Sequence, residues 1–331
     1  MNATTQNDST SFIRKLWATS PEMMVSTAVH LASLVVFVVL ALVDPRVVNG
    51  QVAWIKPVKF AISGAIYMTT LAWVMGHIEG HRRALRVVSW VTGFVLALEV
   101  ALIGMQAGRG VVSHFNVATG FDGAVFTTMG VSVMVAWLTG WTVPVLLVRQ
   151  RFADPALGSA LRTGVIISMI GASLAGLMTA PTASQREGLS RGEQPTRIGA
   201  HTVGVPDGGK GMAVVGWSKE GGDLRIAHFA GLHALQVVPL LGLWIRRRGS
   251  RRGLSGPAQR QMVRVAAGGY LGLIGVLVAQ ALRAEPLLAP SAFTLALFGA
   301  VAVATGLGWI LASRDPAPAR ERAPRAVALA A

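Results

Sequence analysis

Four histidines and three aspartates are the residues best suited to bind a metal or to exchange protons. They are His114, His201, His228 and His233, with Asp122, Asp207 and Asp223. Imidazole and carboxylate groups suit zinc, iron, copper or manganese, and paired histidines also hold haem iron. Their spacing matches no metal motif. His228 and His233 are five residues apart, which places them about 140° apart around a helix axis and so on different faces. Two interpretations stay open: a divalent-metal or haem site at the four histidines, or histidines that only form hydrogen bonds.

Lys56, Lys59 and Glu99 are the other groups that could do chemistry. Most basic residues of this chain are arginines. A pair of lysines therefore suggests a need for a compact charge or an adjustable pKa. The alternative is a pair of lysines that extend to the membrane interface beside Trp54. Glu99 is the only carboxylate well inside an apolar segment, which marks either a functional site or a neutral or lysine-paired structural residue. We expect catalytic groups at Glu99, His114, Asp122 and His233.

A polar stripe follows one face of the helix expected at 57–76 and the turn before it. Its members are separated by steps of three and four residues, which place them on one side of a helix. They are Lys56, Lys59, Ser63, Tyr67 and Thr70. We expect the stripe to bring Lys59 or Ser63 near Glu99, because unpaired charges at that depth are costly.

The expected ligand-binding groups are polar and lie at one set of helix ends. They are Lys56, Lys59, Gln106, Arg109, Asn116, Arg225, Gln236, Gln280 and Arg283. His233 and Gln236 would lie about 10–15 Å below the start of their helix, deeper than a surface position requires. We expect three histidines to share a pocket with Gln106 and Arg109, capped by the glycine-rich segment 199–217. The three are His114, His228 and His233. His30, His77 and His81 are expected at the opposite side of the membrane.

Membrane helices must position these residues. The chain has 331 residues, of which 52% are hydrophobic, and its mean hydropathy is +0.53. Several runs approach the roughly 20 apolar residues that cross a bilayer. We expect an all-α, polytopic membrane helix bundle of about eight transmembrane helices. The expected spans are 23–43, 57–76, 87–105, 123–148, 161–180, 227–245, 265–282 and 291–312. Cysteine is absent, which excludes disulfides and thiolate ligands.

Basic residues orient these helices. Of the 30 lysines and arginines, 19 fall in the two termini and in three loops, counted together with the residues that flank them. The loops are 77–86, 149–160 and 246–264. The positive-inside rule places these segments in the cytoplasm. The expected organisation is a cytoplasmic tail 1–22, a transmembrane domain 23–312 with an extracytoplasmic loop 181–226, and a disordered cytoplasmic tail 313–331. The arginine cluster 246–252 is interpreted as an anchor on anionic lipid, and no nucleic-acid partner is expected.

An internal similarity indicates a 4+4 parallel repeat of helices. Residues 102–109 resemble residues 276–283, an offset of 174, and both segments end helices of the same expected direction. The same offset relates Lys59 to His233. Chance similarity between two apolar helices is the alternative.

Three motifs carry a resemblance to other proteins. They are Trp-x-Lys-Pro-x-Lys-Phe at 54–60, Ser-His-Phe-Asn at 113–116 and Gly-Asp-Leu-Arg-x-x-His-Phe-x-Gly-Leu-His-Ala-Leu-Gln at 222–236. With them the chain resembles a group of uncharacterised bacterial multi-pass membrane proteins. The resemblance implies the bacterial plasma (inner) membrane and no particular activity. The chain departs from the seven-helix zinc hydrolases of the alkaline ceramidase and adiponectin-receptor kind, which have a four-residue histidine spacing and seven spans.

Two function classes fit these residues and motifs. One is a metal- or haem-dependent membrane enzyme or redox protein whose outward-facing site acts on a lipid or quinone-like substrate. The other is a transporter or receptor for a small solute, proton-coupled through Glu99. A structural role is a third. The expected partners are the lipid bilayer and a small-molecule or lipid ligand, while the sequence leaves the oligomeric state open.

Overall fold

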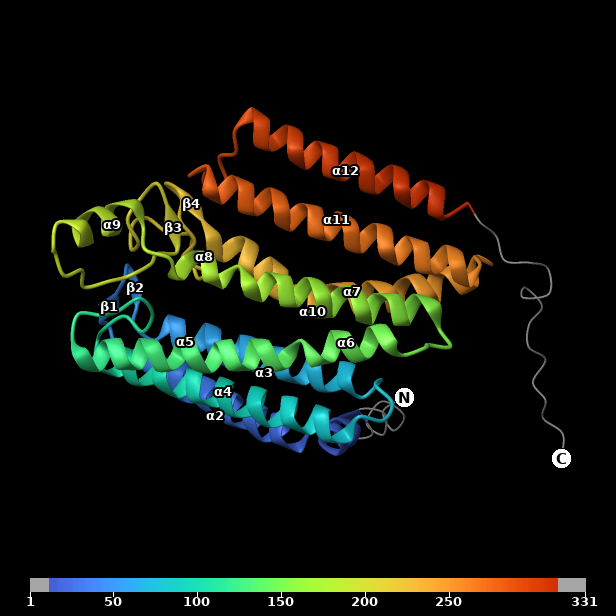
Figure 1. The fold of residues 1–331 in the computed structure, drawn as a ribbon, viewed down its shortest axis with the longest axis horizontal. Coiled ribbons are helices and arrows are strands. Elements are labelled where there is room, and N and C mark those ends of the chain that lie inside the picture. The colour runs from blue at the N-terminus through green and yellow to red at the C-terminus, as the bar shows by residue number, and fades with distance from the viewer. Residues whose placement is uncertain (1–11, 315–331) are drawn as a thin grey trace.

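Eight helical spans, each long and apolar enough to cross a membrane, form the body of the protein in this computed structural model, which describes residues 12–314 (Figure 1). The prediction of an all-α, polytopic helix bundle is confirmed. The helices are α2 (Pro21–Val43), α3 (Ile55–Met75), α4 (Arg82–Gly108), α5 (Gly120–Gly140) with α6 (Thr142–Arg149), α7 (Pro155–Ser173) with α8 (Ala175–Thr179), α10 (Leu224–Arg251), α11 (Gly256–Leu282) and α12 (Ala292–Ala312). Of the tails expected at 1–22 and 313–331, residues 1–11 and 315–331 lie outside the described residues.

Polar side chains define where several of these helices begin. Thr119, Asp154 and Asp223 precede α5, α7 and α10, and each accepts a hydrogen bond from a backbone N–H of the first turn. Such a cap satisfies one of the donors that a helix start leaves free. The helix expected to begin at residue 227 therefore begins at Leu224, because Asp223 caps it.

The helices pack in two groups. In the first, α2 packs mainly on α3 and α4, and α4 packs on α5. In the second, α10 packs mainly on α7 and α11, and α12 packs on α11. Figure 1 shows the two groups one above the other, joined at one end by the turn between α6 and α7. The candidate site lies between them.

Close packing of α7 on α10 depends on two glycines. A Cβ atom added to Gly171 would lie 2.3 Å from the backbone carbonyl carbon of Gly231, far inside any van der Waals contact. Small residues at such a crossing allow two membrane helices to approach closely. This approach brings the α10 side chain of His228 within hydrogen-bonding distance of the Gly171 carbonyl.

The outward faces of the bundle are apolar. Leu42, Leu240 and Val303 are more than half exposed and lie within long helices. Exposed apolar side chains on helices of this length imply a lipid bilayer as the surroundings. The protein is therefore an integral, multi-pass membrane protein.

One end of the bundle carries a cap of short elements (Figure 1). It contains two antiparallel pairs, β1 (Val47–Val48) with β2 (Gln51–Val52) and β3 (Thr202–Val203) with β4 (Gly222–Asp223), and the short helix α9 (Ala183–Ser190). The long loop expected at 181–226 forms most of this cap. The beginning of α2 and the end of α12 lie at the opposite end of the bundle. Which end faces the cytoplasm stays a prediction.

Candidate functional site

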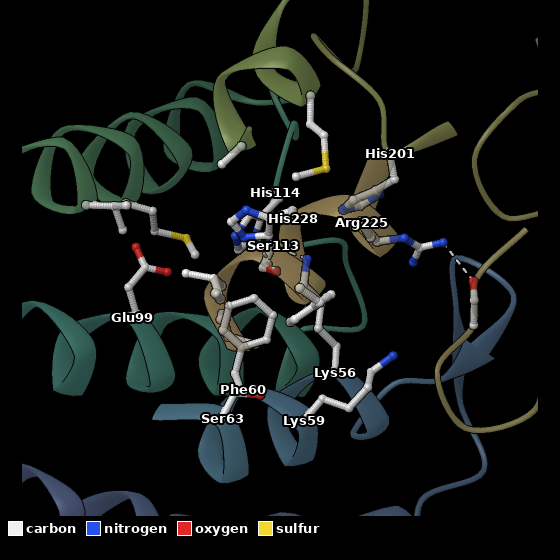
Figure 2. Close-up of a pocket in the computed structure, with 18 of the residues that line it drawn as sticks. Lys56, Lys59, Phe60, Ser63, Glu99, Ser113, His114, His201, Arg225 and His228 are labelled. Carbon is white, nitrogen blue, oxygen red and sulfur yellow. Dashed lines mark hydrogen bonds between the residues drawn. The ribbon is translucent and has the colours of Figure 1, made fainter. Parts of the chain in front are cut away.

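A cavity of about 1260 Å³ lies beneath the cap, between the two helix groups. Its walls come from α3, α4, α5, α10 and the loops of the cap. Nine of the expected histidine, catalytic and ligand-binding residues line it: Lys56, Lys59, Glu99, His114, His201, Arg225, His228, His233 and Gln236. Asp207, Ser63 and Tyr67 line it as well. Figure 2 shows that seven of the nine, from separate segments of the chain, surround one space.

His114 is the centre of the polar end of the cavity. The Lys56 Nζ atom lies 3.1 Å from His114 Nδ1, and the Ser113 hydroxyl oxygen lies 3.0 Å from the same nitrogen, both within hydrogen-bonding distance. Burial, and secondly the neighbouring positive charge of Lys56, holds the pKa of His114 well below its usual value. His114 is therefore a neutral ring, with one protonated and one unprotonated nitrogen.

Two further histidines lie beside His114, each with Nδ1 bound to an acceptor. His201 Nδ1 donates to the Asp207 carboxylate at 2.7 Å, and His228 Nδ1 donates to the Gly171 carbonyl at 2.8 Å. Burial lowers the pKa of His201, although its hydrogen bond to Asp207 acts in the opposite direction. Such acceptors orient a ring and leave its Nε2 atom for another partner.

The two lysines and Arg225 differ in how their charges are balanced. Arg225 pairs with buried Asp223 at 2.5 Å and donates to the Gly216 carbonyl. Lys59 donates to the Gln51 side chain and to the Val215 carbonyl, which ties α3 to the cap. Within residues 12–314, neither Lys56 nor Lys59 forms a salt bridge. The polar end of the cavity therefore holds two lysines without a carboxylate partner, together with the Asp207 carboxylate.

Glu99 lies deeper in the cavity wall, on α4. The residue is 4% exposed, and its Oε1 atom has no hydrogen-bond partner within the part of the chain that the structure describes. Lys59 and Ser63 of the polar stripe line the same cavity, but neither is hydrogen-bonded to Glu99. Figure 2 shows Glu99 on the opposite side of the view from Arg225.

Apolar side chains form a large part of the remaining lining. Ile62 and Ile66 on α3 and Val131, Val133 and Met134 on α5 all line the cavity and are all exposed. These residues lie near the middle of their helices, at the depth of the expected hydrocarbon. The cavity is therefore polar beneath the cap and apolar and open at the level of the membrane core.

Three predicted site residues form a separate cluster between α4 and α5. The Asp122 carboxylate accepts hydrogen bonds from Gln106 at 2.9 Å, from Arg109 at 2.6 Å and from Thr119 at 2.7 Å. Arg109 also packs over the ring of Phe121. Gln106, Arg109 and Asp122 do not line the cavity. The cluster joins the end of one helix to the start of the next, and the catalytic and binding roles of its members stay predictions.

Asn116, Gln280 and Arg283 also lie outside the lining of the cavity. Asn116 binds backbone atoms of its own turn, Gln280 donates to the Pro286 carbonyl, and Arg283 pairs with Glu285 at 2.7 Å. Arg109 and Arg283 thus each pair with a carboxylate beyond their own helix end. The internal repeat itself stays a prediction.

A metal or haem site also stays a prediction. Across the described range, no group of three or more histidine, aspartate or glutamate side chains is arranged to hold a metal ion. His114 uses Nδ1 for Lys56, and His233, which is exposed, contacts Gln236 through Nδ1 at 3.2 Å. The four histidines share the cavity but do not form one ligand set.

His30 was expected at the opposite side of the membrane, yet it also lines the cavity. Gly64 on α3 makes room for it, because a Cβ atom there would lie 2.4 Å from His30 Nε2. Tyr67, from the polar stripe of α3, joins the lining as well. A single histidine on an apolar helix forms no periodic pattern that would indicate a site. Gly64, next to the polar stripe of α3, was the sequence signal that another side chain packs there.

Known proteins add no further constraint. No protein-family model, curated protein or solved structure matches the chain. The interpretation of the cavity therefore depends on its own geometry.

Proposed function

We propose that the protein binds an amphipathic, negatively charged molecule of the lipid class in the cavity beneath the cap. The observation that carries this proposal is the division of one cavity into a cationic end at Lys56 and Lys59 and an apolar, open side at Ile66 and Met134. An anionic headgroup matches the first region and acyl chains match the second.

Charge supports the anionic headgroup. A buried charged side chain in a membrane protein is costly unless a partner or water offsets the charge. Lys56 donates only to a neutral histidine, and Lys59 only to an amide oxygen and a carbonyl. A bound anion would supply the opposite charge that both lysines lack.

Size and access support a lipid. Sites for drug-sized ligands measure about 300–1,000 Å³, and this cavity is larger, at about 1260 Å³. Its exposed apolar lining lies at mid-helix, where an acyl chain can pass to the surrounding bilayer. The proposal includes the orientation predicted from charge, with the cap outside a bacterial inner membrane and both termini in the cytoplasm. It requires no metal or haem.

Lipid binding to the purified protein in detergent tests the proposal by native mass spectrometry. A phosphatidic acid should bind more tightly than a phosphatidylcholine with the same chains. The double variant Lys56→Gln, Lys59→Gln should lose at least about tenfold in affinity for the acidic lipid, since a hydrogen bond to a charged group contributes about 1.5–3 kcal/mol. Lys219→Gln, an exposed cap lysine, is the matched control and should bind normally. Equal binding of both lipids, or an unaffected double variant, would refute the proposal.

A second candidate function is proton-coupled passage of the ligand, favoured by Glu99. A buried carboxylate with an unpartnered oxygen in a cavity wall can bind or release a proton as a ligand moves past it. Glu99→Gln should then retain ligand binding but abolish uptake driven by a pH gradient in proteoliposomes. Uptake at the wild-type rate by this variant would exclude the coupling role.

A further inference from the structure

The hydrogen-bond partners of His114 determine which of its ring nitrogens carries the proton. Beside a bound anion Lys56 is an ammonium, which can only donate, so His114 Nδ1 then accepts its hydrogen bond. The neutral ring then carries its proton on Nε2. Within the described chain, this Nε2–H group has no hydrogen-bond partner, and His114 lines the cavity.

The partners of His201 and His228 determine the opposite arrangement. A carboxylate and a backbone carbonyl can only accept, so Asp207 and Gly171 each take the Nδ1 proton. In the neutral rings, both Nε2 atoms are therefore lone-pair acceptors. Neither Nε2 atom has a partner among residues 12–314, and both residues line the cavity.

The polar end of the cavity thus presents a defined set of groups that can form further hydrogen bonds. It offers two neutral acceptors on His201 and His228, one neutral donor on His114, and the ammonium groups of Lys56 and Lys59. An anion alone would satisfy the lysines and the donor but would leave both acceptors without a proton. Hydroxyl groups on the ligand would satisfy them.

A metal ion is the competing partner for such acceptors. Histidines that bind metal commonly donate their other ring N–H to a carboxylate or a backbone carbonyl, as His201 and His228 do. Described residues supply no group of three or more ligands around them, however. Ligand hydroxyls therefore fit the two acceptors better than a metal does.

We propose that the ligand carries a hydroxylated anionic headgroup, of the glycerol phosphate ester class, whose hydroxyls donate to His201 and His228 while its phosphate faces Lys56 and Lys59. This inference rests on the proposed function and narrows it to one class of headgroup.

Two lipids that differ only in headgroup hydroxyls test the inference. Phosphatidylglycerol and phosphatidylpropanol have the same charge, the same phosphate and the same number of headgroup carbons. Wild-type protein should bind phosphatidylglycerol about tenfold more tightly, since two neutral hydrogen bonds are gained. Equal binding of the two lipids would overturn the inference and leave the proposed function intact. Binding of neither would overturn both.

Variants assign the preference to particular rings. His201→Phe and His228→Phe should each reduce the preference for phosphatidylglycerol, whereas His228→Gln, which keeps an acceptor oxygen, should retain part of it. His77→Phe is the control, because His77 lies outside the cavity lining. A full preference in both phenylalanine variants would contradict the assignment. The wild-type comparison needs no variant, so it stays decisive if a variant misfolds.

Two further measurements distinguish a lipid headgroup from a soluble phosphate ester and from a metal ion as the partner of these side chains. If soluble glycerol phosphate displaces phosphatidylglycerol at equal concentration, the hydroxylated phosphate is supported as the recognised group, but the lipid-class proposal fails. Stoichiometric metal in the purified wild-type protein, lost in both phenylalanine variants, would overturn the hydroxyl inference.

Discussion

Lys56 Nζ lies 3.1 Å from His114 Nδ1, and this contact joins the start of α3 to the loop that precedes α5. Among residues 12–314, Lys56 and Ser113 are the residues whose side chains lie within hydrogen-bonding distance of the His114 ring. Two of the three sequence motifs meet here. The motif that begins α10 completes the same space with His228 and His233.

The absence of cysteine makes the orientation directly testable. Lys219→Cys lies exposed in the cap, and Ser250→Cys lies exposed at the opposite end of α10. In intact spheroplasts, a membrane-impermeant maleimide should label the first variant, and should label the second only after permeabilisation. The opposite labelling pattern would reverse the orientation and the sidedness of the cavity.

Asp122 should matter for stability and not for ligand binding. Asp122→Asn removes the charge that accepts from Gln106, Arg109 and Thr119, which should cost about 1–3 kcal/mol because a buried group is left poorly paired. The melting temperature in detergent should fall, while lipid affinity at a lower temperature stays the same. Arg191→Gln, in an exposed ion pair, should change the melting temperature little. Lost lipid binding in a stable Asp122→Asn variant would instead indicate a functional role.

The cap should loosen as the pH falls. Burial lowers the pKa of His201, so its neutral form is favoured in the folded state. Its contribution to stability is fully present above the unfolded pKa of about 6.5 and is lost as the pH falls below that value. For Asp207, burial alone would raise the pKa, but the contacts with His201 and Thr202 hold it well below its usual value. That contribution is lost only below about pH 3.9.

Hydrogen exchange of segment 199–218 measures this effect. After correction for intrinsic rates, exchange in this segment should increase between about pH 7.5 and pH 5.5, on either side of the usual histidine pKa. Segment 120–140 serves as the internal reference, and His201→Phe should remove most of the pH dependence. Exchange in the cap that is independent of pH would refute the role of His201.

The helices were predictable because lipid surroundings require only length and hydropathy, and both can be read from runs such as 23–43 and 291–312. Boundaries moved where a single side chain caps a helix, as Asp223 does for α10. Capping requires the backbone geometry of the preceding turn, which hydropathy does not describe.

The candidate site was predictable only in part. Lys56, His114, His228 and His233 share the cavity because their helix ends meet beneath the cap. Gln106 and Arg109 point instead to Asp122, because the turn after α4 brings the start of α5 beside them. The direction of a side chain at a helix end depends on that turn, and the sequence pattern does not specify it.

An anionic amphiphile in the cavity should have its chains beside α3 and α5. A phosphatidic acid with a diazirine in one acyl chain, photolysed with the protein in lipid nanodiscs, tests it by mapping the labelled peptides. We expect labelling around Ile62, Ile66 and Met134, reduced in the Lys56→Gln, Lys59→Gln variant and weaker with a phosphatidylcholine probe. Labelling confined to lipid-facing positions such as Val303 and Leu307 on α12, equal for both probes, would contradict it.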